Sequence, residues 1–510
     1  MVMFADSIKS GEIPNWSQGF ANYGYPLALI AHQLPAYLGA GLILIGLSPE
    51  TVFSTIIVVS TLASGIGMYI FISNLLSDKA LTQPATNAAL LGASVWLLSS
   101  YRLMNIYSRG AIPELFAAAL IPFLLSSIVL YMRRQRTRYL AAISLLSFLL
   151  VITHPMMLLI AAPLILATTI STKWRSVSIV SLAIVIGILV ASYYIVPLYL
   201  ELKYLYLGAN GSSIGNDTYL SLKNFFVWRW PYFPIGDHPG PRVGPIQVGV
   251  PEFAILLLGY CVSIYLGIKK SLSKATQLLI WVTTATISLT LTTRIAQPLY
   301  EILPVLDSIQ FPWRFLLPYQ FAVSVVIAML AYKYHMSARY ILIGIVILAV
   351  FRLPEAYGKN FTITPLTDYQ FNQENLHSTT MNPVWVGDTN DYPVTDSLFS
   401  IVEGDGTVTI IQEKPSSRIY MLEAETPVRV SFNTFYFPGW QLEVNGQPTE
   451  TEYQDPNFRG VMTTRIEGGK HELVLLYNDT RVRLFAKLVS LVAIVSFLLV
   501  LWLHTRQKNF

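Results

Sequence analysis

Long apolar stretches with almost no charge dominate the chain between Glu50 and Arg352. Stretches such as 51–75, 113–132 and 484–503 have about the 20 residues that a helix needs to cross the hydrocarbon core of a membrane. The pattern predicts eleven crossings, near residues 51–75, 86–101, 113–132, 139–153, 155–171, 176–200, 249–267, 275–293, 314–332, 339–357 and 484–503. We therefore expect a polytopic α-helical membrane protein.

Basic residues lie in short segments between the predicted spans. They gather at 133–138, 173–175, 269–274, 333–339 and 506–508. The positive-inside rule makes these segments cytoplasmic, so that the loops at 102–112, 201–248, 294–313 and 358–483 face outward. This topology predicts a multi-pass protein of the cell membrane with a cytoplasmic C-terminal tail. The net charge of +5 is then a topology signal, and we expect the lipid bilayer as a partner and no nucleic acid.

The first 50 residues are expected outside the membrane by the same parity. The apolar run 27–47 contains His32, Gln33 and Pro35, which suit an interfacial helix better than the centre of a span. On this interpretation the chain begins within an outer loop, and a first anchoring helix is missing upstream. The alternative is that 27–47 is a twelfth span.

Residues 358–483 have a different pattern, with short β-rich runs separated by turns. Alternation of apolar and polar residues is visible at 407–411, 428–432 and 472–476. Asn445-Gly446 predicts a tight hairpin, because a type I′ turn needs positive φ at both central residues. We expect an extracytoplasmic β-sandwich here. The predicted domains are a loop with interfacial helices (1–50), a helical transmembrane domain (51–357), the β domain (358–483) and a final helix with a tail (484–510).

Cysteine and histidine do not indicate a metal site. Cys261 is the single cysteine, which excludes a disulfide within the chain, and the seven histidines are scattered without ligand spacing. The cofactor therefore stays unknown, with a divalent cation left open.

Several segments resemble bacterial YfhO-like membrane proteins, which belong with the GT-C fold of glycosyltransferases. The segments are Gly11–Trp16 with Tyr23–Pro26, Arg109-Gly110-Ala111 with Glu114, Gln310–Arg314 after Leu303–Leu306, and Phe435–Trp440 with Asn445-Gly446. The resemblance implies transfer of a sugar from a polyprenyl-phosphate carrier to an extracytoplasmic cell-envelope polymer or lipid acceptor. Two alternatives stay open: a transporter or flippase of lipid-linked sugars, and a non-catalytic envelope scaffold related to the family.

The resemblance also implies an acidic residue in the first outer loop, just after a first span. The chain departs from the family here, because it starts downstream of that position. Asp6 is the nearest acidic candidate for a catalytic base, and a solvated helix residue is its alternative interpretation. The departure leaves open whether the chain comes from a truncated gene or is not catalytic.

Cations at the outer ends of spans are candidates for holding the carrier phosphate. Arg314, with Gln310 and Trp313 before it, lies at the start of one predicted span, and Arg109 precedes another. Snorkelling to lipid headgroups is the alternative for both arginines. Glu114 is placed to form a salt bridge with Arg109 or to act as a carboxylate of the site.

Further candidates lie in turns and loops of the outer side. His154 caps the turn between two predicted helices or acts as an acid or base near the carrier. Arg229 and Trp230 combine a cation with an aromatic ring, as sugar stacking or an interfacial aromatic belt requires. Asp237 beside His238 is a possible acid–base pair.

Overall fold

The computed structural model describes residues 1–17, 23–77, 82–172, 177–206, 218–226, 246–356, 382–387, 395 and 397–507. The chain forms two compact units. One unit comprises Met1–Val52, Ser192–Gly211 and Ile363–Val492, and we call it the β unit. The other comprises Phe53–Ala191, Ser212–Thr362 and Ala493–Phe510, and we call it the helical unit.

The helical unit is built from the apolar stretches of the sequence. Its longer helices are α4 (Pro49–Leu76), α5 (Gln83–Leu97), α7 (Ile112–Arg134), α8 (Thr137–Thr153), α10 (Ala162–Thr172), α11 (Val177–Val190), α14 (Val250–Ile268), α15 (Leu272–Leu291), α17 (Leu316–Lys333) and α18 (Ala338–Ala356). Shorter ones are α6 (Ser100–Tyr107), α9 (Met156–Ile160), α13 (Lys223–Phe226) and α16 (Gln297–Ile302). A helix satisfies its own backbone hydrogen bonds, which is why an apolar segment in lipid adopts it.

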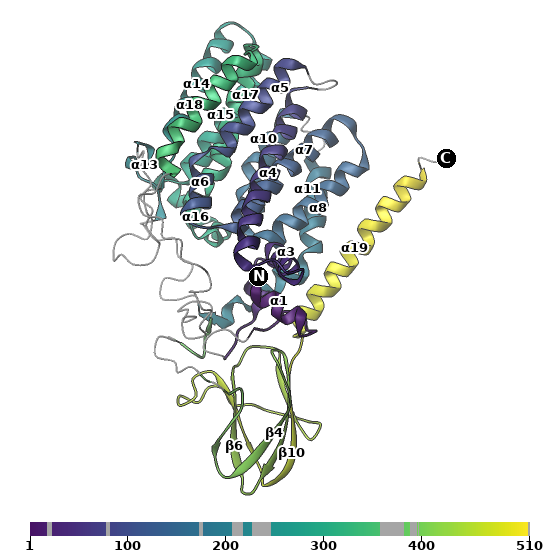
Figure 1. Ribbon diagram of the computed structural model, residues 1–510. Coiled ribbons are helices and arrows are strands. Elements are labelled where there is room, and N and C mark those ends of the chain that lie inside the picture. The colour runs from purple at the N-terminus through teal and green to yellow at the C-terminus, as the bar shows by residue number, and fades with distance from the viewer. Residues whose placement is uncertain are drawn as a thin grey trace. The chain divides into compact units, whose positions relative to one another are not determined.

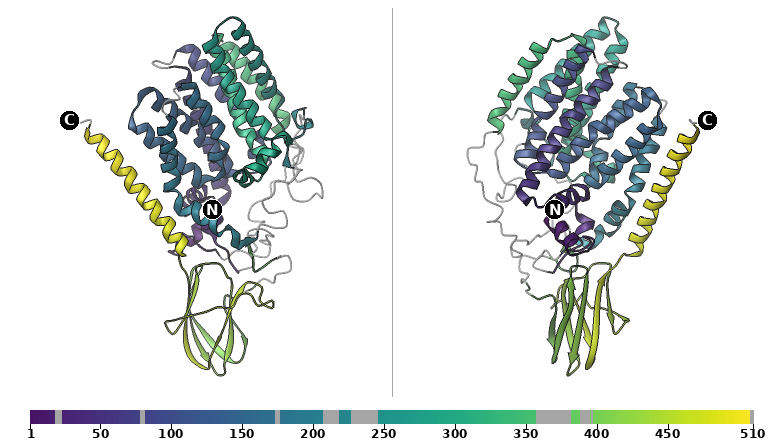
Figure 2. Two further views of the ribbon diagram at one scale, coloured as in Figure 1. Left: turned by 180° about the vertical axis from the view of Figure 1, so that it is seen from behind. Right: turned by 45° about the vertical axis from the view of Figure 1, so that its right-hand side comes forward.

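Helix α17 is the central element of the helical unit. It packs against α5, α14 and α15, and these helices lie side by side in Figures 1 and 2. Aromatic rings fill the interface: Phe321 contacts Trp96 at a ring-centroid distance of 5.3 Å and Phe71 at 5.5 Å. The apolar sequence of α17 is thus buried by protein, whereas α18 presents Ile343, Val346 and Val350 at the surface.

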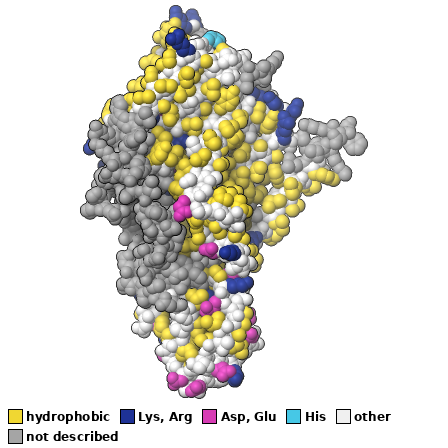
Figure 3. Space-filling view, viewed as in Figure 1, with side chains coloured by type: hydrophobic (Ala, Val, Ile, Leu, Met, Phe, Trp, Pro, Cys, Tyr) yellow, Lys and Arg dark blue, Asp and Glu magenta, His cyan; other side chains and the backbone are white. Residues whose placement is uncertain are grey.

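The outer surface of the helical unit is largely apolar. Figure 3 shows hydrophobic side chains over it, with Lys and Arg at one end. Five helices of the described residues are long and apolar enough to cross a membrane, or six if one bent pair counts as a single span: Pro49–Leu76, Ile112–Arg134, Val250–Ile268, Pro312–Lys333 and Arg481–Leu499, plus the pair Val177–Val190 and Ser192–Tyr204. An apolar surface of this kind is what lipid requires.

Three predicted spans differ from the helices observed. The stretch 86–101 ends as a helix at Leu97, after which α6 begins at Ser100. The stretch 155–171 is divided at Ala161 into α9 and α10, and 176–200 is bent by 70° near Ala191. Hydropathy averages over a window and therefore misses such breaks, since the residues at each break are as apolar or small as their neighbours.

The β unit contains two antiparallel sheets. The five-stranded sheet has the order β4-β5-β10-β7-β8, and the three-stranded sheet the order β3-β6-β9. The strands are β3 (Ser400–Glu403), β4 (Gly406–Lys414), β5 (Ser417–Ala424), β6 (Val428–Phe435), β7 (Trp440–Val444), β8 (Gln447–Thr449), β9 (Val461–Ile466) and β10 (Gly469–Tyr477). One apolar cluster includes Tyr420 and Leu473 of the larger sheet and Phe432 of the smaller. Side chains of the two sheets thus share one apolar cluster, and Figure 2 shows the strands in two orientations.

The predicted hairpin at Asn445-Gly446 is confirmed. Both residues have positive φ, 52° and 74°, and Val444 pairs with Gln447 across the turn from β7 to β8. The register follows from the turn, because a two-residue loop leaves one way of pairing the strands.

The N-terminal segment is part of the β unit. It contains α1 (Val2–Lys9), α2 (Leu27–Ile30) and α3 (Gln33–Leu44), so the apolar run 27–47 forms two short helices broken at Ala31. Trp16 is fully buried in the apolar cluster of the sheets, with its ring centroid 5.2 Å from that of Trp440. The unit also contains the short pair β1 (Leu205–Tyr206) and β2 (Asn382–Pro383), and α12 (Ser192–Glu201).

The C-terminal helix α19 (Arg481–Gln507) starts within the β unit. Its Arg483 forms an ion pair with Glu201 at the end of α12, with 2.8 Å between Nη2 and Oε2. Glu201 is buried and Arg483 is nearly so, and Arg483 also donates to the backbone oxygen of Pro438 at 3.0 Å. This contact fixes the point at which the last strand passes into α19.

Candidate functional site

The corner between α6 and α7 carries the densest group of buried polar side chains among the described residues of the helical unit. Helix α6 begins after Ser99, whose extended backbone ends the preceding turn. Gly110 has a φ of +56°, which lets the chain reverse before α7 starts with Pro113 in its first turn. Arg109 is therefore placed beside the first turn of α7, which carries Glu114.

Glu114 is the centre of this group. Arg109 forms a fork on the carboxylate, with Nη1 2.9 Å from Oε2 and Nη2 3.0 Å from Oε1. Arg314 donates its Nε to Oε1 at 3.0 Å, and the hydroxyl of Tyr101 donates to Oε2 at 2.6 Å. The amide of Asn105 donates to the same Oε2 at 3.2 Å. We call Arg109, Glu114 and Arg314 the arginine–glutamate cluster.

Arg314 reaches the cluster from a turn before α17. The turn is the 3-10 helix Pro312–Phe315, and it follows Gln310, whose φ is +63°. Nη1 of Arg314 donates to the backbone oxygen of Ile309 at 2.5 Å and to Oε1 of Gln310 at 3.3 Å. The guanidinium carbon of Arg109 lies 4.5 Å from the ring centroid of Trp313. The segment Gln310–Arg314 thus contributes a hydrogen bond from Gln310 to Arg314 and the aromatic face of Trp313 to Arg109.

The cluster carries one uncompensated positive charge. Its two arginines share one carboxylate, and their side chains are 14% and 8% exposed while that of Glu114 is 3% exposed. All contacts of Glu114 are with donors, so its oxygens have no capacity left to take a proton from a substrate. This geometry favours a structural role for Glu114 and leaves net positive charge for an anion.

A second buried network adjoins the first through α6. Arg352 of α18 pairs with Glu252 of α14 at 2.5 Å, and the backbone N–H of Ser100 donates to the same carboxylate at 3.2 Å. Gln320 of α17 donates to the Ser100 hydroxyl at 2.7 Å and accepts from the backbone N–H of Tyr101 at 3.0 Å. The first residues of α6 are therefore held by α14 and α17, and Arg352 of α18 holds Glu252 in turn.

Arg102 is a further buried cation of this region. It is 3% exposed, and its Nη1 donates to the hydroxyl of Ser64 on α4 at 3.0 Å. Burial lowers the pKa of its guanidinium to about 10, so it remains charged at neutral pH. Sequence reasoning missed Arg102, Glu252 and Arg352. Ionisable residues within or beside apolar helices were the signal that could have found them, since such residues in membrane helices mark functional or paired positions.

The structure brings together half of the predicted site residues. Arg109, Glu114, Gln310, Trp313 and Arg314 meet at the corner just described. His154 is buried at the end of α8, where its extended backbone terminates the helix.

The remaining predicted site residues do not enlarge this corner. Asp6 is exposed on α1 of the β unit. Arg229, Trp230 and Asp237 lie outside the described residues. Among the described residues, no group of three or more His, Cys, Asp or Glu is arranged to hold a metal ion.

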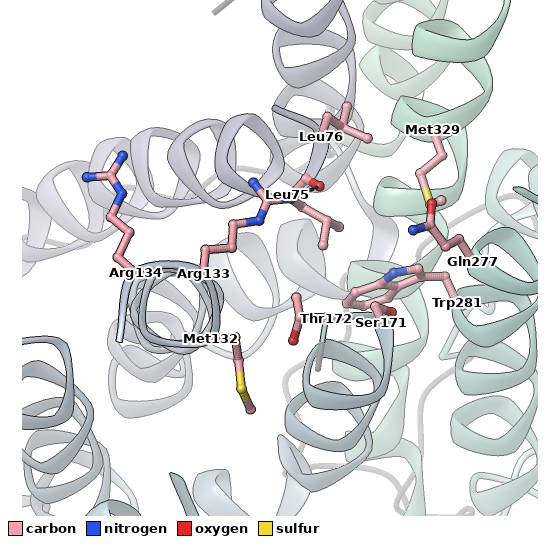
Figure 4. A pocket seen from close by; sticks show the side chains of 10 residues that line it. All are labelled: Leu75, Leu76, Met132, Arg133, Arg134, Ser171, Thr172, Gln277, Trp281 and Met329. Atoms are coloured by element: carbon pink, nitrogen blue, oxygen red, sulfur yellow. Dashed lines mark hydrogen bonds between the residues drawn. The ribbon is translucent and has the colours of Figure 1, made fainter. Parts of the chain in front are cut away.

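A pocket of about 460 Å³ lies at the other end of α7 (Figure 4). It is lined by the last residues of α4, α7 and α10 and by residues of α15 and α17: Leu75, Leu76, Met132, Arg133, Arg134, Ser171, Thr172, Gln277, Trp281 and Met329. Arg133 donates to the backbone oxygens of Asn74, Ser77 and Leu75, which end α4. It thus caps a helix C-terminus, where a cation is stabilising. The predicted topology assigns this end to the cytoplasmic side.

Comparison with known proteins shows the family but no individual relative. Neither the curated proteins nor the solved structures contain a significant match. A family model described as "6-pyruvoyl-tetrahydropterin synthase related domain; membrane protein" matches residues 32–357, which is well over half of the chain and includes the corner between α6 and α7 together with Arg314. The chain therefore belongs to this family of membrane proteins.

Proposed function

We propose that this protein is a membrane glycosyltransferase that moves a sugar from a polyprenyl-phosphate carrier to an extracytoplasmic acceptor of the cell envelope. The observation that carries the proposal is the buried, uncompensated charge of the arginine–glutamate cluster. The two sequence segments that form the cluster, Arg109–Glu114 and Gln310–Arg314, are also segments that resemble YfhO-like proteins. The β unit would lie outside the membrane and guide the acceptor.

The charge of the cluster suits the chemistry of such a carrier. In the transfer, an acceptor hydroxyl attacks the anomeric carbon of the sugar, and the bond from that carbon to the phosphate oxygen breaks. The phosphate keeps the electron pair and changes from a diester with one negative charge to a monoester with close to two. Donors already fixed in a desolvated site stabilise such developing charge without reorganising. Arg109 and Arg314 are fixed in this way by Glu114, Gln310 and Trp313.

The proton of the acceptor hydroxyl needs a base other than Glu114, whose oxygens are already occupied by donors. Asp6, His154 and Asp237 stay candidates for this role. A divalent cation also stays open.

A second candidate is a transporter or flippase of lipid-linked sugars. One observation favours it, namely the buried ion pair of Glu252 with Arg352, because ionisable residues inside membrane helices commonly line a transport path. The pair is held in place by Ser100 and through Gln320, which is more typical of a fixed structural contact. We therefore place this candidate second.

Reconstitution into liposomes can distinguish the two. The purified protein would be given a polyprenyl-phosphate-linked radiolabelled sugar and a crude envelope acceptor fraction, and two quantities would be measured. One is sugar released from the carrier to the acceptor, and the other is movement of intact carrier between leaflets. We expect transfer with the wild type and with Arg339→Met, an exposed control, and its loss with Arg314→Met. Faster movement of the intact carrier between leaflets than in liposomes without protein, with no sugar transfer, would support the transporter instead.

A further inference from the structure

Arg102 is a buried cation with no acidic partner in the part of the chain that the structure describes. The neighbouring arginines each meet a carboxylate: the partly buried Arg109 and the buried Arg314 meet Glu114, and the buried Arg352 meets Glu252. Arg102 has one hydrogen bond, from Nη1 to the hydroxyl of Ser64. Its Nε and Nη2 are shielded from solvent and have no partner. Removing a charge from water without pairing it is among the most unfavourable arrangements in a folded protein.

Ser64 does not explain why Arg102 is there. The hydroxyl of Ser64 accepts a hydrogen bond from Nε1 of Trp96 at 2.7 Å and donates one to the backbone oxygen of Ala118 at 3.1 Å. It is therefore satisfied without the arginine. A guanidinium has five donor hydrogens, and a single bond to a neutral hydroxyl leaves most of them unused.

The unpaired nitrogens form a recognisable binding edge. Nε and Nη2 lie on the same side of the planar guanidinium, and two parallel N–H bonds from this edge match two oxygens of a phosphate or carboxylate. Both nitrogens of this one edge are unpaired, whereas Nη1 on the opposite side is used. The unsatisfied part of Arg102 thus has the geometry of a bidentate oxyanion site.

We propose that the Nε–Nη2 edge of Arg102 binds the phosphate group of an amphiphile that enters the helical unit from the membrane. The nitrogens are shielded from water and the surface of the unit is apolar (Figure 3), so an anion attached to an apolar chain reaches them more readily than a free ion. A phosphate suits this edge because two of its oxygens can accept the two parallel N–H bonds. The proposal does not depend on sugar transfer and holds equally for a transporter.

Binding requires local movement. Because Nε and Nη2 are closed off in the structure, the side chains that cover them must move to admit a phosphate. A phosphate supplies the counter-charge that Arg102 lacks. It binds only the open arrangement of these side chains and therefore shifts the equilibrium toward that arrangement.

The test compares lipids that differ only in the phosphate. Purified full-length protein in detergent would be titrated with dioleoyl phosphatidic acid and with dioleoylglycerol, and lipid affinity and melting temperature would be measured. We expect phosphatidic acid alone to bind and to raise the melting temperature of the wild type. Arg102→Met should weaken binding about 10- to 100-fold, the loss of a charge-assisted contact. Without lipid it should melt no lower than the wild type, because Ser64 keeps its other partners and no buried charge remains.

Two control variants and inorganic phosphate complete the design. Arg339→Met removes an exposed arginine and should behave like the wild type. Arg102→Lys keeps the charge but not the two-nitrogen edge, and should bind phosphatidic acid more weakly than the wild type. If Arg102→Met does not fold, the affinity of Arg102→Lys for phosphatidic acid tests the proposal instead. If inorganic phosphate alone raised the melting temperature of the wild type but not that of Arg102→Met, this result would support an oxyanion site at Arg102 and overturn the proposal that its ligand is an amphiphile.

Equal phosphatidic acid affinity of wild type, Arg102→Met and Arg102→Lys would overturn the proposal entirely. Failure of the proposed sugar transfer is a separate result. Arg314→Met should abolish transfer and leave phosphatidic acid binding at Arg102 in place, because Arg314 pairs with Glu114 and not with Arg102.

Discussion

Replacing Glu114 by Gln tests the arginine–glutamate cluster directly. The carboxylate accepts five contacts: two from Arg109 and one each from Arg314, Tyr101 and Asn105. An amide has one oxygen and one NH₂ group in the same positions. At least two of the contacts, those at Oε1, would then face donor to donor, and both arginines would lose their counter-charge.

The magnitude follows from two independent estimates. Hydrogen bonds to charged groups are worth about 1.5–3 kcal/mol each, so the loss of two costs about 3–6 kcal/mol. Removing one partner of a buried ion pair costs about 3–5 kcal/mol. The entropy of unfolding grows with chain length, so a unit of about 300 residues shifts by about 1–2 °C per kcal/mol, and Glu114→Gln should lower the melting temperature by about 3–12 °C.

The assay is thermal unfolding of the purified protein in detergent at a fixed scan rate, followed by intrinsic fluorescence. Glu301→Gln is the matched control, since Glu301 is exposed and should change stability by less than about 0.5 kcal/mol. Arg314→Met should cost less in the Glu114→Gln background than in the wild type, because it then removes an unpaired charge. The predicted role of the arginine–glutamate cluster in stability would be refuted if Glu114→Gln melted at the same temperature as the wild type. Additive effects of Glu114→Gln and Arg314→Met would refute it as well.

Three further predictions concern the β unit. Gly24→Ala should lower its melting temperature by several degrees, because Gly24 has a φ of +82° and an added Cβ would lie 2.2 Å from Nε1 of Trp16; an unchanged melting curve would contradict that packing. The backbone N–H of Asn457, and then Arg429, hold the pKa of Asp455 below its usual range. The stabilisation by Asp455 should thus be present above about pH 4 and be lost as the pH falls through the lowered pKa. Between about pH 5 and pH 3, Asp455→Asn should therefore lose less melting temperature than the wild type. Gln447→Cys, in a background without Cys261, should react with an impermeant maleimide from outside intact cells; labelling only after lysis would reverse the predicted topology.

Local pattern was sufficient where the backbone alone decides the structure. Asn445-Gly446 predicted its hairpin because positive φ is a property of those two residues and not of their surroundings. Apolar stretches predicted helices because an apolar segment must satisfy its own hydrogen bonds. The same reasoning failed at Leu97 and Ala191, where helices end or bend and only small serines follow in the sequence.

Contacts between residues far apart in the sequence were not predictable in detail. The sequence suggested Arg109 and Arg314 as outer cations and Glu114 as a partner for Arg109, and all three residues meet. That Arg314 shares the same carboxylate was not expected, because 200 residues separate it from Glu114. Trp16 and Trp440 likewise come from two segments of the same resemblance, and only folding brings the two rings into edge-to-face contact.

The sequence by itself determined the class of protein: apolar helices, a β-rich segment before the last helix, and cations where an outer site was expected. The tertiary structure decided which charges are neutralised. Arg109 and Arg314 have a carboxylate, and Arg102 does not, although all three are arginines close to the ends of apolar helices. The physical reason is that hydropathy depends on each residue's own chemistry, whereas the state of a buried charge depends on which atoms the rest of the fold brings within about 3 Å of it.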